Sequence, residues 1–314
     1  MQNLIFSLNV VSPVFLIILL GIVLKRSHII DDTFISVSSK VVFNVAMPAL
    51  VFNEICRIDF RAAFDLKQVL WVYAGTLAVF ICAWLLVLLL TRDGRDQGAF
   101  IQGSVRSNYA IVGFSIILNM FGSNALSLAA ILLAFIMPVY NVLAVVALTA
   151  PLNRERHLGA LKTLFMIIKN PLILALIVAL PFSLSRINVP EALSVAVTYL
   201  AKMTLPLALL GIGGSLNFAS VKKDWRLALV ATILRLIVFP AALTYGAICL
   251  GYRGESLGVI FVLFATPTAI ASFIMAKAMN SNAELAGNIV LLTTLGSVVT
   301  MSLGIFIIRT LGYF

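Results

Sequence analysis

The chain has few charged residues, few cysteines and few histidines for its length. Of its 314 residues, 11% are charged, three are cysteine and two are histidine, whereas 62% are hydrophobic. The mean hydropathy is +1.11. A soluble domain has about 25% charged and roughly 45–50% apolar residues, so one water-soluble core cannot hide this much apolar surface. The composition predicts an all-α integral membrane protein.

The scarcity of cysteine and histidine excludes several other classes of protein. Cys56, Cys82 and Cys249 are odd in number and lie in apolar runs, which does not fit a secreted disulfide scaffold. His28 and His157 fall in predicted loops, and no cysteine or histidine spacing suits a metal ion, so we expect no metal and no other cofactor. No Gly-rich phosphate loop, paired intramembrane aspartates or Ser/His arrangement is present within the predicted spans, so we expect no enzyme.

Long apolar stretches predict ten transmembrane helices. A helix needs about 20 residues to cross roughly 30 Å of hydrocarbon. The stretches lie at 7–24, 34–54, 69–90, 99–120, 125–149, 163–183, 192–214, 226–250, 257–279 and 284–308. The loops between them are short and leave no room for a soluble domain.

Basic residues are divided unequally between the two faces that ten spans would create. One set of loops carries 12 lysines and arginines and the other set carries six, while four more lie within or near the spans. The richer face is expected to be cytoplasmic. We therefore expect a multi-pass protein of the cell membrane with both termini extracytoplasmic. The net charge of +10 is then an imprint of membrane topology and not a sign of nucleic-acid binding.

The two halves of the chain match each other at an offset of 158 residues. The matches are Pro13 with Pro171, Pro48 with Pro206, 123–125 with 281–283 and, at an offset of 159, 108–114 with 267–273. Five spans per half is an odd number, so the second copy would enter the membrane from the opposite face. We expect a first five-helix repeat at 1–152, a short cytoplasmic loop at 153–162 and an inverted second repeat at 163–314.

Polar residues, glycine and proline interrupt the fourth and ninth predicted spans near their centres. Asn108 and Tyr109 lie about 14 Å into span 4 at 1.5 Å per residue, and Pro267 and Thr268 are similarly central in span 9. Broken backbone inside a membrane must be buried in protein or line a wet cavity, and the N-terminal ends of half-helices attract anions. One such proline alone would be interpreted as an ordinary kink. The matched pair predicts a substrate site.

Four basic residues within or near the spans indicate what the site would bind. Arg106, Lys202, Arg235 and Lys277 have no carboxylate at mid-span to pair with, and each costs about 2.5–3.5 kcal/mol at a helix centre. An anionic substrate is a natural partner for them. Arg106 and Lys277 also lie near enough to span ends to reach water instead. Asn44 occupies the position equivalent to Lys202 in the first repeat and joins the candidate site.

These motifs, taken in their order and spacing, resemble the auxin efflux carrier family, including bacterial members known as malate or malonate permeases. The resemblance covers nearly the whole chain and rests on residues 44–52, 106–109 with Gly113, 201–202, Arg235 with Pro240, and Pro267 with 276–277. It implies a ten-helix inverted repeat similar to bile acid symporters and sodium/proton antiporters, in which helices 4 and 9 cross. Helices 1, 2, 6 and 7 would form a scaffold, and helices 3–5 and 8–10 a moving transport domain.

The resemblance also implies roles for individual residues. Asn108 matches the family's substrate-facing asparagine and Pro267 its crossover proline. Ser107 stands where plant members usually have proline, which implies a softer first break, and the long cytoplasmic loop of plant members is missing. A homodimer through the scaffold helices is a further expectation.

The sequence predicts a secondary carrier of a small organic anion, with a carboxylate as the favoured class, working by elevator-like alternating access in the lipid bilayer. Asn108 and the backbone around Pro267 would bind the carboxylate, and Lys202 or Arg235 would complement its charge. A mid-membrane carboxylate is usual in proton or sodium sites. None is found in the sequence, which favours uniport or potential-driven movement.

Three alternatives stay open at the level of sequence. Coupling to a cation through carbonyls and hydroxyls, such as those of Thr266, Thr268 and Ser272, is the first. The second is an anion channel of the same fold, which would show non-saturating flux. The third is a sensor or scaffold that does not transport and would tolerate the loss of Asn108.

Overall fold

The regular structure in the described part of the chain is helical. The computed structural model describes all residues except 1, 57–63, 153–170, 186, 188 and 217–224. The elements are α1 (Gln2–Arg26), α2 (Asp32–Val41), η1 (Val42–Ala46), α3 (Met47–Cys56), α5 (Leu66–Leu90), α6 (Gly94–Val105), η2 (Tyr109–Gly113), α7 (Phe114–Phe121), α8 (Ser123–Thr149), α10 (Pro171–Ser185), α11 (Glu191–Ser215), α12 (Trp225–Ile233), η3 (Leu234–Val238), α13 (Phe239–Cys249), α14 (Gly254–Ala265), α15 (Ala271–Ala278) and α16 (Ala283–Thr310). The three η elements are single π-helical turns.

Seven helical segments in the described part are long and apolar enough to cross a membrane. They are Ile5–Arg26, Asp32–Cys56, Leu66–Leu90, Ser123–Thr149, Glu191–Ser215, Trp225–Cys249 and Ala283–Thr310. The apolar segments Tyr109–Phe121 and Gly254–Ala265 are shorter, because the fourth and ninth predicted spans are interrupted. Of the sixth predicted span, only the part within α10 lies in the described residues, and the loop predicted at 153–162 lies outside them. The chain is an integral membrane protein.

Polar side chains fix where several of these helices begin. Asp31, Asp65, Asp93 and Asn282 each precede a helix, and their side-chain oxygens accept a hydrogen bond from a backbone N–H in its first turn at 2.7–2.9 Å. Such caps satisfy donors that have no partner within the helix. They separate α2, α5, α6 and α16 from the polar segments before them.

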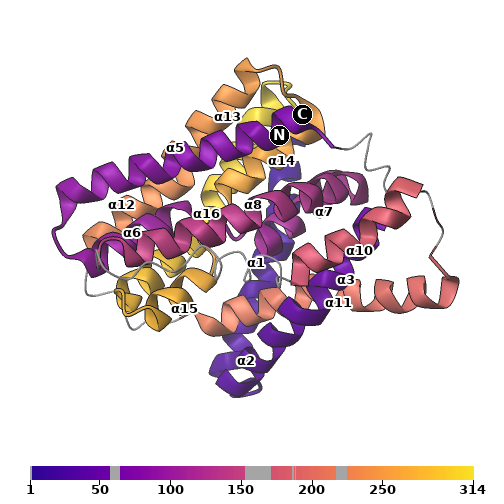
Figure 1. The fold of residues 1–314 in the computed structure, drawn as a ribbon, viewed down its shortest axis with the longest axis horizontal. Helices are drawn as coiled ribbons and strands as arrows, with labels where there is room; N and C mark the ends of the chain where they lie inside the picture. Colours follow the sequence, from indigo (N-terminus) through magenta and orange to yellow (C-terminus); the bar gives the residue numbers. More distant parts are fainter. Residues whose placement is uncertain (1, 57–63, 153–170, 186, 188, 217–224) are drawn as a thin grey trace.

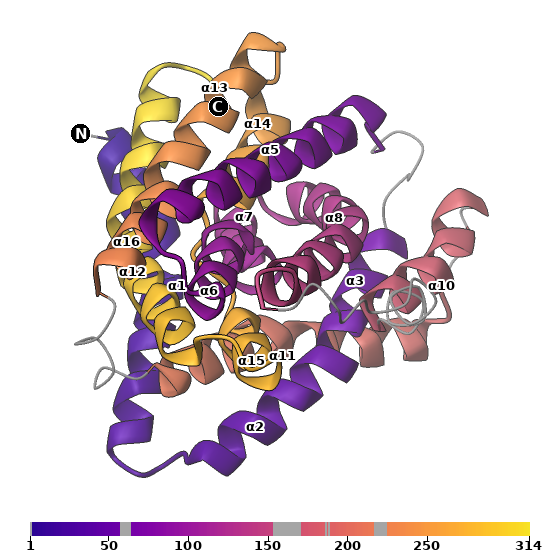
Figure 2. The same ribbon diagram turned by 60° about the vertical axis from the view of Figure 1, so that its left-hand side comes forward.

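The helices pack in two groups (Figures 1 and 2). In the first, which we call the α1–α11 group, α11 packs along α1 and α3, and α10 packs on α3. The second, the crossing group, contains α5 to α8 and α12 to α16. The groups also touch, since α1 packs along α16 and against α7.

Both termini lie on one face of the molecule, at the top of Figures 1 and 2. The side-chain amide of Asn3 donates to the hydroxyl of Thr310 at 3.2 Å, and the guanidinium of Arg309 lies 3.5 Å from the ring centroid of Phe6. Two termini on the same face agree with an even number of membrane-spanning segments.

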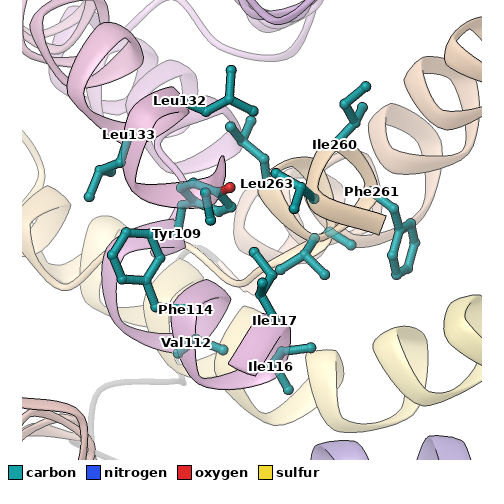
Figure 3. Close-up of a cluster of buried hydrophobic side chains, with 14 of the residues drawn as sticks. Tyr109, Val112, Phe114, Ile116, Ile117, Leu132, Leu133, Ile260, Phe261 and Leu263 are labelled. Carbon is teal, nitrogen blue, oxygen red and sulfur yellow. The ribbon is translucent and has the colours of Figure 1, made fainter. Parts of the chain in front are cut away.

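Many large apolar side chains lie on the outer surface. Leu19, Leu85 and Leu89 are exposed, the last by 84% of its side chain. Large exposed apolar areas are rare on soluble monomers. The interior is closely packed: Figure 3 shows Tyr109 beside Phe114, with the aliphatic side chains of α8 and α14 around them. Because of its exposed apolar side chains, the exterior is suited to contact with lipid.

Candidate functional site

The fourth and ninth predicted spans are interrupted where the sequence predicts. α6 ends at Val105, and helical structure resumes in η2 at Tyr109. α14 ends at Ala265, and α15 begins at Ala271. The interruptions are thus 106–108 and 266–270, and their residues are mostly buried.

The two interruptions are hydrogen-bonded to each other through their backbones. The N–H of Asn108 donates to the carbonyl of Pro267 at 2.8 Å, and the N–H of Ala269 donates to the carbonyl of Arg106 at 3.0 Å. Together they form one antiparallel bridge between Ser107 and Thr268. Backbone groups that no helix can satisfy in a membrane interior are satisfied here by the opposite break. We call this junction the crossing.

Hydroxyl side chains at the crossing cap the opposite helix reciprocally. Ser107 donates to the carbonyl of Leu263 in the last turn of α14 at 2.8 Å. Thr268 donates to the carbonyl of Gly103 in the last turn of α6 at 2.6 Å. Ser107 and Thr266 also share a hydrogen bond between their hydroxyls. Each break therefore closes the C-terminal end of the other broken helix.

Arg235 joins the same two C-terminal ends. It lies on η3, is 1% exposed, and donates through Nε to the carbonyl of Thr266 at 2.8 Å. Its two terminal nitrogens donate to the carbonyls of Val105 at 3.1 Å and Leu263 at 3.2 Å. Its guanidinium therefore faces helix C-terminal carbonyls from both breaks.

Polar groups at the N-terminal ends of the half-helices that follow the breaks lack such partners. The side-chain amide of Asn108, which is 5% exposed, makes no hydrogen bond within the described residues, and neither does the N–H of Ile270 just before α15. The hydroxyl of Ser272 in the first turn of α15 is buried and also has no partner in the described part of the chain. Together with the first backbone N–H groups of η2 and α15, these groups remain able to donate a hydrogen bond at the helix N-termini that follow the two breaks.

Arg106 is also buried, and its side chain contacts two helices of the crossing group. One terminal nitrogen donates to the Oδ1 of Asn141 on α8 at 3.0 Å, and the other contacts the sulfur of Met275 on α15 at 3.3 Å. The side chain is 8% exposed. It links three helices around the crossing and does not reach water as a residue near a span end would.

Lys202 lines a cavity of about 410 Å³ between α1, α3, α7 and α11, which we call the α1–α11 cavity. Asn53, Glu54, Asn119 and Thr198 supply further polar wall. α11 also contacts η2, the turn that follows the first break.

The remaining predicted site residues are Tyr109, Asn44 and Lys277. Tyr109 is fully buried in the apolar core, its ring 5.7 Å from that of Phe114 (Figure 3), and its hydroxyl has no partner among the described residues. Asn44 is exposed on η1 and donates to the carbonyl of Lys40 at 2.9 Å. Lys277 is exposed in the last turn of α15.

Sequence reasoning missed Glu54. It is the last residue of the second predicted span, 34–54, and it is only 7% exposed in the cavity wall. Its carboxylate accepts from the amide of Asn53 at 3.1 Å and from the hydroxyl of Ser127 on α8 at 3.4 Å. The signal was the adjacent polar pair Asn53-Glu54 inside an apolar stretch.

Long apolar helices, with two broken ones joined at their interruptions, define a polytopic membrane protein built to handle a solute. The chain belongs to the membrane transport protein family, whose model matches residues 6–305. Members of this family are transporters and not enzymes, and this chain is a multi-pass membrane transporter.

Individual relatives agree with this assignment and with the predicted auxin efflux carrier resemblance. An uncharacterized transporter of Methanothermobacter thermautotrophicus is 23% identical over 303 residues, covering 95% of this chain and 97% of the relative. The uncharacterized transporter YfdV of Escherichia coli K12 is 23% identical over 314 residues, covering 97% and 98%. A probable auxin efflux carrier component 5b of Oryza sativa is 35% identical over 71 residues, covering 23% and 19%.

Proposed function

We propose that this transporter is a secondary carrier of a small organic anion, a carboxylate, with its binding site at the crossing. The observation that carries the proposal is the set of unpartnered groups at the N-termini of the half-helices that follow the breaks, which includes the amide of Asn108, the N–H of Ile270 and the hydroxyl of Ser272. Hydrogen-bond donors at a helix N-terminus, with the positive end of the helix dipole, are a suitable environment for a carboxylate.

The proposal includes ten spans arranged as two inverted repeats of five. Gly94 and Gly254, which begin α6 and α14, are 160 residues apart, as are Ser123 and Ala283, which begin α8 and α16. The reciprocal hydroxyl caps at the crossing supply further support. A hydroxyl of each break caps the helix that ends at the other break, as expected for two elements related by a twofold axis. The termini are proposed to be extracytoplasmic in the cell membrane, on the strength of the loop charges.

The two helix groups are suited to alternating access. The crossing group holds both breaks and the buried Arg106 and Arg235, and a backbone bridge joins the two breaks. The α1–α11 group supplies Lys202 from a facing helix. We propose that the crossing group moves against the α1–α11 group in an elevator-like manner, and that the α1–α11 group also provides any dimer contact.

Within this proposal the predicted residues have different tasks. Asn108 and the backbone beside Pro267 hold the carboxylate, and Lys202 attracts it from the α1–α11 cavity. Thr268 and Arg106 hold the breaks in place. Tyr109 packs the core behind them, while Asn44 and Lys277 lie at the surface, outside the binding step.

The driving force is proposed to be the substrate gradient and the membrane potential. Among the described residues, the buried carboxylate is that of Glu54, which lies in the cavity wall between α3 and α8 and not at the crossing. A cation coupled through a carboxylate would be expected at the substrate site itself.

The test is uptake by proteoliposomes containing the purified chain, after a thermal-shift screen of mono- and dicarboxylates, since a ligand of the folded state raises apparent stability. Asn108→Ala and Lys202→Ala should each lower uptake by about tenfold or more, because a hydrogen bond to a charged group contributes about 1.5–3 kcal/mol. Asn124→Ala and Lys67→Ala, both at exposed positions, are the matched controls.

Saturation of uptake distinguishes the carrier from a channel of the same fold. Wild-type protein that binds a carboxylate but never moves it would instead indicate a sensor. If both site variants transported every carboxylate as well as the wild type, the site proposal would be wrong.

A further inference from the structure

The carbonyl side of the crossing has the chemistry of a cation site. Four oxygens converge there: the carbonyls of Val105, Leu263 and Thr266, and the hydroxyl of Thr266. They come from the C-terminal ends of α6 and α14, where the helix dipoles place partial negative charge. Neutral oxygens at unwound helix ends are ligands that small monovalent cations accept in transporters.

The positively charged guanidinium of Arg235 lies among these four oxygens. Its Nε and both terminal nitrogens donate to these oxygens at 2.8–3.4 Å, and its recorded partners are all neutral carbonyl or hydroxyl groups. The side chain is 1% exposed, so solvent does not compensate the charge. The helix ends therefore supply the negative potential that keeps a buried guanidinium in place.

The local backbone is adapted to this contact. Arg235 lies on η3, a single π-helical turn between α12 and α13. A π-turn inserts an extra residue into a helix and redirects its side chains, and such turns are frequent at functional sites. η3 packs against α6, α14 and α16, so Arg235 belongs to the crossing group and would travel with it.

We propose that Arg235 is a built-in cation occupying a carbonyl-lined site for a monovalent cation, and that it positions both breaks from there. It acts on substrate only through the crossing and is a positioning residue, not a direct ligand of the anion. Removing its side chain leaves the four oxygens without a cation. The vacated site would take free guanidinium, which carries the same planar donors. Only the transport readout of this proposal rests on the proposed function.

The experiment compares Arg235→Ala with Arg253→Ala. Arg253 is a matched control because it also donates to carbonyls, those of Ile248 and Tyr252 at 2.9 and 2.6 Å, but is exposed. In detergent without substrate, millimolar guanidinium should raise the melting midpoint of Arg235→Ala by several degrees and leave Arg253→Ala and the wild type unchanged. In proteoliposomes, Arg235→Ala should lose about tenfold or more of its uptake, and guanidinium should restore most of the loss.

A second pair of variants tests the proposal for Arg235 if Arg235→Ala does not fold. Arg235→Lys keeps a cation and Arg235→Met keeps volume without charge. The lysine variant should retain a higher midpoint and more uptake than the methionine variant. Equal losses in the two, or no guanidinium response in folded Arg235→Ala, would overturn the proposal. The melting experiment stands even if the wild type moves no carboxylate, so failure of the carrier proposal and failure of this one are separate results.

Discussion

The two sides of the crossing differ in whether their polar groups have hydrogen-bond partners within the chain. On the carbonyl side, the chain supplies its own partners: Ser107, Thr268 and Arg235 donate to the last turns of α6 and α14. On the N–H side, the amide of Asn108 and the N–H of Ile270 are left without partners in the described structure. The chain thus closes the side that would attract a cation and leaves open the side that would attract an anion.

This difference shows how one crossing of two broken helices can favour one sign of charge. Crossed half-helices present carbonyl ends and N–H ends together, so the bare arrangement suits cations and anions alike. Fixing a guanidinium among the carbonyls removes one of the two options. It also adds a positive charge within the crossing, which favours a nearby anion over a cation.

The largest expected effect comes from placing a negative charge on the open side. Asn108→Asp should lower carboxylate uptake by about 100-fold or more, because juxtaposed like charges cost several kcal/mol. Uptake by proteoliposomes measures this, with Asn124→Asp at an exposed position as the control. Uptake at the wild-type rate would mean that the anion does not bind on the side of Asn108.

A smaller effect is expected from opening the closed side. Thr268→Val keeps the shape of the side chain but leaves the carbonyl of Gly103 without its hydroxyl donor, which should cost about 1–3 kcal/mol of stability. Ser107→Ala should cost less, because Arg235 also donates to the carbonyl of Leu263. The melting midpoints measure this order.

The control for these two variants is Thr300→Val, which removes only a bond from Thr300 to Gly296 within its own helix. It should change the midpoint least of the three. A midpoint for Thr268→Val equal to that of Thr300→Val would contradict the view that the hydroxyl caps close the crossing.

The sequence was sufficient for the seven long apolar helices of the described part and for the position of the breaks, because those features depend on local patterns. The stretch predicted at 69–90 is α5 (Leu66–Leu90), and the two interruptions fall at the predicted polar residues. The hydrogen-bond partners of Arg235 could not be predicted from the sequence, because they lie 28 to 130 residues away along the chain and meet only when three helices pack. Burial of Glu54 was missed for the same reason: it is the last residue of a predicted span, and α8, 73 residues further along the chain, contacts it.

The smallest expected effect concerns the charges in the α1–α11 cavity, which both Glu54 and Lys202 line. Glu54→Gln keeps the size of the side chain and its ability to accept a hydrogen bond, but removes a negative charge that repels an entering anion. Uptake at low ionic strength should rise about two- to threefold, and the gain should disappear at high salt, since screening weakens such guidance. Glu191→Gln, at an exposed position, should have no effect. A loss of uptake in Glu54→Gln that salt does not alter would instead make Glu54 a participant in the transport step, and the crossing alone would no longer account for it.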